Sequence, residues 1–119
     1  MRSVWVALLG VAMAVATAAQ QPSSVLHIIH IKWKLEATPE QIKAAVDAAQ
    51  QLPQRFPGIK RVWTRNLRYQ GQERFNQAIV LEFENAEALR RYDGSAAQKW
   101  WYEFYLPLRE DSRIDDLAN

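Results

Sequence analysis

The sequence VLHIIHIKWK, residues 25–34, alternates between two sets of side chains as a β-strand does. In an extended chain successive side chains point to opposite faces, so every second residue shares a face. One face carries Val25, His27, Ile29, Ile31 and Trp33, and the other carries Leu26, Ile28, His30, Lys32 and Lys34. The two histidines of the chain therefore point in opposite directions, so they cannot bind one metal ion together.

The residues that follow predict a helix and then a hairpin. TPEQ at 38–41 is a capping box with proline at the first helical position, and apolar residues then recur at helical spacing as far as Leu52. Pro57-Gly58 predicts a turn. The β-rich runs 59–67 and 75–83 are joined by a polar segment, and they predict two hairpin strands.

The last third of the chain predicts two helices and a strand. Asn85 can cap a short helix, and SAAQ at 95–98 is a second capping box that opens a helix through about Leu106. The segment 109–117 has weak β character and predicts a fourth strand. The element order β-α-β-β-α-α-β predicts an α+β, ferredoxin-like subunit, in which helices cover one face of an antiparallel sheet.

The residues before this domain have the composition of a secretory signal peptide. Arg2 precedes an apolar run over 4–16, and small residues follow it. The run is shorter than the roughly 20 residues that a membrane span needs. A buried N-terminal helix is the alternative, but it would show caps and a polar face. We predict a signal peptide over 1–19, a short linker over 20–24, and export to a bacterial periplasm or to the outside.

Charge and cysteine content exclude several kinds of partner. Loss of Arg2 with the signal peptide takes the formal net charge from +2 to +1, which predicts no strong attraction to nucleic acid or membrane. There is no cysteine, so the exported domain folds without disulfides. The acids near the C-terminus lack the spacing of a calcium loop, and we expect no metal and no cofactor. Because the second sheet face would carry Leu26 and Ile28, we expect a homodimer that covers it.

Taken together, several segments resemble the stress-responsive α/β-barrel (Dabb) family. The matching segments are HIIHIKWK from His27, EATPEQI from Glu36, PGIK from Pro57, Phe75 with IVLEFE from Ile79, and Leu89 with Tyr92. The resemblance covers 25–117 and implies a ferredoxin-like subunit that dimerises through its sheets into a barrel with the helices outside. It also implies a cleft between sheet and helices. In one member, the plant olivetolic acid cyclase, that cleft closes a polyketide ring.

The resemblance carries over to some site residues and not to others. The family's strand-one histidine falls on His27, its tyrosine before a His-Pro-x-His motif on Tyr92, and a late acidic residue on Asp116. The motif itself falls on 95–98, where both histidines are missing and Gln98 stands in place of the second. Glutamine cannot take up a proton near neutral pH, so the cyclase's general base has no counterpart. A further histidine of that enzyme falls on Gln77.

The same residues define a candidate ligand pocket. His27 and Gln77 each place a polar group on an otherwise apolar face, where it needs a hydrogen-bond partner. Either the two side chains are partners in the core, or both contact a ligand. The aromatic run 100–105 predicts a core-facing stripe of Trp101, Phe104, Tyr105 and Leu108, in which Trp101 could also wall the cleft. The predicted pocket residues are His27, Gln77, Tyr92, Gln98, Trp101 and Asp116.

Two classes of function fit this sequence. The first is an exported, non-enzymatic dimer that binds a small, partly apolar molecule in the cleft, or that serves simply as a stable module in the stress response. The second is a cyclase- or lyase-like enzyme acting on a carbonyl or aromatic compound, with His27 as base or orienter, Tyr92 as donor to an oxyanion and Asp116 orienting the histidine. The enzyme requires His27 and Tyr92 to converge on one open cavity. The antibiotic-biosynthesis monooxygenase type has a related dimeric fold, but the strand-one and Pro-Gly matches favour the Dabb family.

Overall fold

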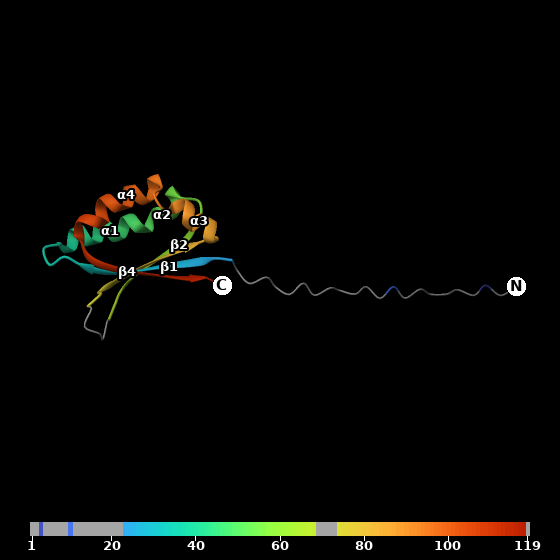
Figure 1. The fold of residues 1–119 in the computed structure, drawn as a ribbon, viewed down its shortest axis with the longest axis horizontal. Coiled ribbons are helices and arrows are strands. Elements are labelled where there is room, and N and C mark those ends of the chain that lie inside the picture. Colours follow the sequence, from blue (N-terminus) through green and yellow to red (C-terminus); the bar gives the residue numbers. More distant parts are fainter. Residues whose placement is uncertain (1–2, 4–9, 11–22, 69–73, 119) are drawn as a thin grey trace.

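A four-stranded antiparallel sheet is the centre of the fold (Figure 1). The computed structural model describes residues 23–68 and 74–118, together with Ser3 and Gly10. The strands are β1 (Val25–Trp33), β2 (Ile59–Asn66), β3 (Gln77–Phe83) and β4 (Arg109–Ala118), in the spatial order β2-β3-β1-β4. This order confirms the predicted ferredoxin-like α+β subunit, including the fourth strand near the C-terminus.

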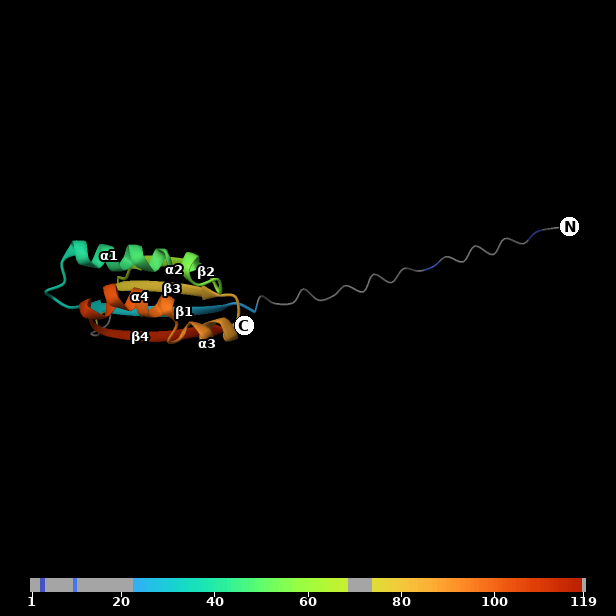
Figure 2. The same cartoon turned by 90° about the horizontal axis from the view of Figure 1, so that it is seen from above.

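All the helices lie on one face of the sheet (Figures 1 and 2). They are α1 (Pro39–Gln50), α2 (Leu52–Arg55), α3 (Ala86–Tyr92), α4 (Ala96–Tyr105) and the 3₁₀ turn η1 (Leu106–Leu108). The sequence predicted one helix as far as Leu52, whereas α1 ends at Gln50 and α2 follows it. Pro53 has no N–H to donate to the preceding turn, so it begins a new helix instead of continuing the old one.

The predicted capping box starts α1. The Thr38 hydroxyl accepts a hydrogen bond from the Gln41 backbone N–H at 3.2 Å, and the Gln41 side chain accepts one from the Thr38 N–H at 3.0 Å. The buried face of α1 consists of Ala45, Ala48 and Ala49, whose small side chains let the helix approach its neighbours closely. The indole Nε1 of Trp101 donates to the Ala45 carbonyl at 3.0 Å and ties α4 to α1.

The core lies between the sheet and the helices, and α4 supplies its largest side chains. Trp101 and Tyr105 stack with their ring centroids 4.4 Å apart, and both are almost completely buried. These positions confirm the predicted core stripe for Trp101, Tyr105 and Leu108. The prediction is wrong for Phe104, whose side chain is 39% exposed. The buried stripe continues back from Trp101 to Ala97, one turn earlier, which rotates it away from Phe104. Phe104 packs instead on Trp100, with ring centroids 5.2 Å apart.

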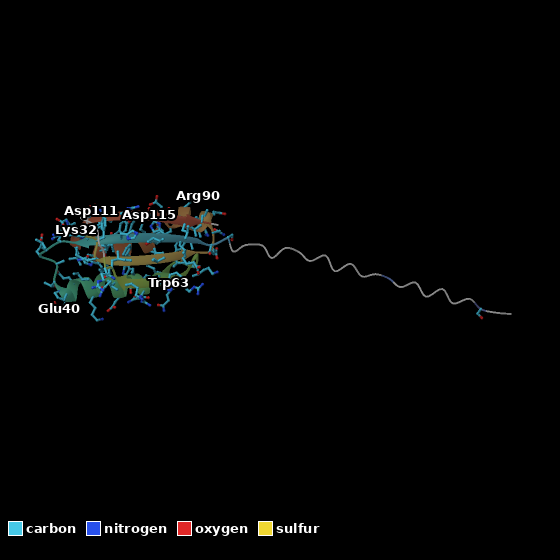
Figure 3. The ribbon with its side chains drawn as sticks, turned by 90° about the horizontal axis from the view of Figure 1, so that it is seen from below. Lys32, Glu40, Trp63, Arg90, Asp111 and Asp115 are labelled. Carbon is cyan, nitrogen blue, oxygen red and sulfur yellow. The ribbon has the colours of Figure 1, made fainter. Side chains whose placement is uncertain are left out.

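The face of the sheet opposite the helices is open (Figure 3). Leu26 and Ile28 lie on it, half-buried, as the alternation in β1 predicted. The Glu82 side chain is buried on the same face and accepts a hydrogen bond from Arg61 Nε at 3.0 Å. The predicted signal peptide and residues 20–22 of the linker lie outside the described residues, apart from Ser3 and Gly10. Within the part of the chain that the structure describes, no helix is long and apolar enough to cross a membrane.

Candidate functional site

Strand pairing places an acid beside the strand-one histidine. β1 and β4 run antiparallel with His27 opposite Asp116, on the helix-covered face. The Nδ1 atom of His27 lies 2.6 Å from Oδ1 of Asp116, and the histidine side chain is only 15% exposed. A carboxylate can only accept in this bond, so Nδ1 carries the proton. In the neutral imidazole, Nε2 is then the nitrogen that can accept a proton or a hydrogen bond.

Tyr92 brings a buried phenol to the same end of the sheet. Asn85 caps α3 by accepting a hydrogen bond from the Ala88 N–H at 2.8 Å, and Tyr92 is the last residue of that helix. Its ring packs against Phe83 and Phe56, with centroid distances of 5.2 and 5.5 Å. Its hydroxyl is buried and has no hydrogen-bond partner among the described residues. Burial raises the pKa of the Tyr92 phenol, so it stays a neutral donor.

Gln98 connects the start of α4 to a second phenol. Ser95 caps α4 as predicted, accepting from the Gln98 N–H at 3.2 Å. The Gln98 side chain does not complete the predicted capping box, because its Oε1 accepts from the Gly94 N–H at 2.6 Å instead. Its Nε2 lies 3.1 Å from the Tyr102 hydroxyl. We did not predict Tyr102 as a site residue, although its position one turn after Gln98 was a usable signal.

These side chains surround one cavity of about 330 Å³ between the sheet and the helices α3 and α4. Its lining residues are His27, Leu89, Arg90, Tyr92, Asp93, Gln98, Tyr102, Ile114 and Asp116. The structure therefore brings together four of the six predicted pocket residues. Leu89 and Ile114 supply apolar surface, whereas the imidazole, two phenols and an amide supply hydrogen-bonding groups. His27 and Tyr92 line the same cavity, as the enzyme hypothesis requires.

Gln77 and Trp101 do not line this cavity. Gln77 pairs with Ile31 of β1, four residues along the strand from His27, a separation of about 13 Å. Its Nε2 donates to the Arg65 carbonyl at 2.9 Å, so the expectation that Gln77 is the partner of His27 is wrong. Gln77 lines a separate groove of about 540 Å³ between α1 and β2. Trp101 is 1% exposed and belongs to the core.

The second histidine lies outside the cavity. His30 is on the open face of the sheet, where its Nε2 is 3.5 Å from Oδ2 of Asp115. The two histidines therefore lie on opposite faces, as the alternation in β1 predicted. Among residues 23–68 and 74–118, no group of three or more His, Cys, Asp or Glu side chains is arranged to hold a metal ion.

An antiparallel ferredoxin-like sheet, helices on one face and a polar-lined cavity beneath them define the subunit of an α/β-barrel protein. The chain belongs to the stress responsive A/B barrel domain family (Dabb), whose pattern matches residues 25–119. This match confirms the family predicted from the sequence. A comparison with curated proteins gave no match.

Solved structures share the fold at low sequence identity. A hydroxynitrile lyase from Passiflora edulis superposes with a TM-score of 0.74 at 16% identity, covering 83% of this chain and 95% of the lyase chain. A dimeric ferredoxin-like protein from Thermobifida fusca gives 0.69 at 19% identity, covering 83% and 93%. A dimeric protein with a ferredoxin-like fold from Bacteroides fragilis gives 0.63 at 16% identity, covering 82% and 97%. These likenesses establish the fold of the subunit.

Proposed function

We propose that the protein is an exported homodimer that binds a small, partly apolar molecule in the cavity between β1, β4 and the helices α3 and α4. The observation that carries the proposal is the Tyr92 side chain, which lines the cavity and whose buried hydroxyl has no hydrogen-bond partner among the described residues. A buried polar group of this kind costs free energy unless something bonds to it. A ligand oxygen in the cavity would supply that bond.

The size and lining of the cavity set the kind of ligand. Ligand pockets span roughly 300 to 1,000 Å³, and this cavity of about 330 Å³ is at the lower end. Leu89 and Ile114 favour an apolar portion, while His27, Tyr92 and Tyr102 favour one or two oxygen atoms. A ligand with one ring or a short chain and one polar group matches this lining.

Export and dimerisation form the second part of the proposal. The N-terminal sequence supports export, because a charged residue, a short apolar run and small residues follow one another over 1–19. The open sheet face supports a dimer, since it holds the half-buried apolar side chains Leu26 and Ile28. Neighbours of the same fold are described as dimeric. A two-fold pairing through this face would cover both side chains in each subunit.

Ligand binding is tested by titrating small ketones, alcohols and carboxylates into the ¹⁵N-labelled protein and following backbone resonances by NMR. We expect saturable shifts around His27, Tyr92 and Ile114. Ile114→Trp should fill the cavity and abolish those shifts. The control Ile42→Trp fills the separate groove between α1 and β2 and should leave them unchanged. Shifts that persist in Ile114→Trp would contradict the proposal. The absence of shifts with every compound tested would contradict it as well.

A second candidate function is proton abstraction next to a carbonyl group. Asp116 holds Nδ1 of His27, which leaves Nε2 to act as a base, and the neutral Tyr92 phenol lines the same cavity. Nε2 would take the proton from the carbon, and Tyr92 would donate a hydrogen bond to the enolate oxygen that forms. The hydroxynitrile lyase among the structural neighbours supports this candidate, since this fold can carry an enzyme.

The catalytic candidate has its own test. The methyl protons of acetophenone exchange with D₂O when a base removes them, and ¹H NMR follows their loss. We expect the protein to accelerate this exchange. His27→Gln should lower the catalysed exchange rate by at least about 100-fold, the usual contribution of a general base. Exchange at the same rate in His27→Gln would exclude His27 as the base, while leaving the binding proposal standing.

A further inference from the structure

We infer that Tyr102 is a second hydrogen-bond donor of the cavity, that Gln98 positions it, and that the two tyrosines together select a neutral carbonyl compound, an aldehyde or a ketone. This inference rests on the proposed binding function and specifies its ligand class. It follows from the direction of two consecutive hydrogen bonds, from Gly94 to Gln98 and from Gln98 to Tyr102, and from the charges around the cavity.

The direction of the hydrogen bonds begins at a backbone group. A backbone N–H can only donate, so the Gly94 N–H, 2.6 Å from the Gln98 side chain, must face its oxygen, Oε1. Gly94 can aim its N–H in this way because it adopts a φ of 76°, a conformation that favours glycine. With Oε1 fixed, the amide nitrogen Nε2 must face Tyr102, and it lies 3.1 Å from the hydroxyl.

Gln98 therefore determines which way the Tyr102 hydroxyl proton points. An amide nitrogen only donates, so the Tyr102 oxygen accepts this bond and cannot direct its own proton back along it. That proton is left for another acceptor. Since Tyr102 lines the cavity, a ligand oxygen is placed to accept it.

Both phenols are neutral donors near neutral pH. Burial raises the pKa of Tyr102, and the negative charge of Asp93 raises it further, against opposing effects of Arg109 and Gln98. Burial also raises the pKa of Tyr92, and the proximity of Tyr102 adds to it. Both tyrosines line the same cavity, and each phenol holds a proton. Two donors suit a carbonyl oxygen, which has two lone pairs and no proton of its own.

The charges around the cavity favour a neutral ligand over a carboxylate. Two acids, Asp93 and Asp116, line the cavity, whereas Arg90 is the one arginine or lysine in the lining. A carboxylate ligand would meet these like charges in a partly desolvated site, which is unfavourable. A ketone would meet no such repulsion and could place its apolar substituent against Leu89 and Ile114.

The experiment uses acetophenone labelled with ¹³C at the carbonyl carbon and measures its affinity and its bound ¹³C shift. Loss of one neutral hydrogen bond weakens binding by roughly 3- to 10-fold, so we expect that change for Tyr102→Phe. The bound carbonyl resonance should also move upfield, because a donor to the oxygen deshields the carbon. The matched control is Tyr105→Phe, which removes the same atom one turn away in the core of α4 and outside the cavity.

The role of Gln98 is tested by Gln98→Glu, which preserves the size of the side chain and reverses its hydrogen bond. A carboxylate at this position accepts from both the Gly94 N–H and the Tyr102 hydroxyl, so the Tyr102 proton turns away from the ligand. We expect Gln98→Glu to weaken acetophenone and shift its carbonyl resonance upfield as Tyr102→Phe does. In the double variant, Gln98→Glu should weaken binding almost no further than Tyr102→Phe alone, because both substitutions remove the same donor, the Tyr102 hydroxyl.

The outcomes distinguish failure of this inference from failure of the proposed ligand binding. If the unaltered protein binds one of the alcohols or carboxylates but not acetophenone, the inference fails and the binding proposal stands; if it binds none of the compounds, both fail. If it binds and Tyr102→Phe changes neither affinity nor carbonyl shift, the cavity binds ligands but Tyr102 is not a donor to them. If Tyr102→Phe has its effect and Gln98→Glu has none, Gln98 does not position Tyr102. Benzoate binding as tightly as acetophenone would overturn the preference for a neutral ligand.

Discussion

His27 and Asp116 are 89 residues apart in the chain, and their side chains meet at 2.6 Å between Nδ1 and Oδ1. The contact exists because β1 pairs with β4 in a register that sets these two residues opposite each other on the helix-covered face. It fixes the histidine ring beside the cavity and leaves Nε2 available to a ligand. Both proposed functions use the ring in this orientation.

We expect the His27–Asp116 pair to contribute measurably to folding. The pair is partly exposed, since the Asp116 side chain is 48% exposed, so its coupling should be only about 0.5–1 kcal/mol. A cycle of His27→Gln, Asp116→Asn and the double variant, followed by urea unfolding, measures it. The matched control is His30–Asp115 on the open face, whose N–O distance is 3.5 Å and whose coupling should be smaller. Strictly additive effects of His27→Gln and Asp116→Asn would contradict the prediction.

Alkaline pH should destabilise the protein through Tyr92. Its pKa is raised in the folded state, mainly by burial, relative to about 10 in the unfolded chain. Above pH 10 the unfolded chain loses the phenolic proton while the folded chain retains it, so the unfolded state binds fewer protons. The free energy of unfolding then falls as pH rises, by up to about 1.4 kcal/mol per pH unit for this group. Below pH 10 the effect disappears.

The contribution of Tyr92 can be isolated with Tyr92→Phe. Burial also raises the pKa of Tyr102 and Tyr105, so the variant should lose part of the alkaline slope and keep the rest. Urea unfolding between pH 8 and 11, with absorbance of the ionised phenol recorded in parallel, measures both quantities. An unchanged slope in Tyr92→Phe would show that this phenol ionises freely in the folded protein.

Trp101 should matter more for stability than its neighbour Trp100. Trp101→Phe removes the indole hydrogen bond to the Ala45 carbonyl and opens space in the core, and each effect costs free energy. We expect a loss of about 2–4 kcal/mol in urea unfolding. Trp100→Phe is the control, because Trp100 is only half-buried under the Arg55 guanidinium, and it should cost less than about 1 kcal/mol. Equal losses for the two variants would contradict the core assignment.

The proposed dimer predicts an assembly defect on the open sheet face. Ile28→Lys places a charge where the partner subunit would pack, so sedimentation should show single subunits, while circular dichroism keeps its native form. Leu35→Lys is the control, since Leu35 is 99% exposed and should leave the dimer intact. A dimer that survives Ile28→Lys would place the interface elsewhere.

Local sequence patterns were sufficient for most of the fold. The alternation over 25–34 set the two faces of β1, and the capping box at 38–41 marked the start of α1. Such signals depend on neighbouring residues only, and they need no knowledge of the partner strand. The pattern failed at Phe104, where the buried stripe of α4 depends on which turn faces the sheet.

The candidate site was only partly readable from the sequence. His27, Tyr92 and Asp116 were assigned through a resemblance to the family, and no local pattern joined them. Gln77 was misplaced because a polar residue on an apolar face does not reveal its partner, which is the Arg65 carbonyl. Tyr102 was missed although it lies one turn after Gln98, because the contact of its hydroxyl with the Gln98 amide is visible only in the folded structure.

The sequence by itself determined most elements of this protein: where strands alternate and where helices are capped. Only the tertiary structure decided which elements pair and in which register. Register brought Asp116 to His27 and set Gln77 about 13 Å along the sheet from it. The physical reason is that periodicity and capping depend on adjacent residues, whereas strand pairing joins segments distant in the chain and is fixed by burial of the whole sheet face.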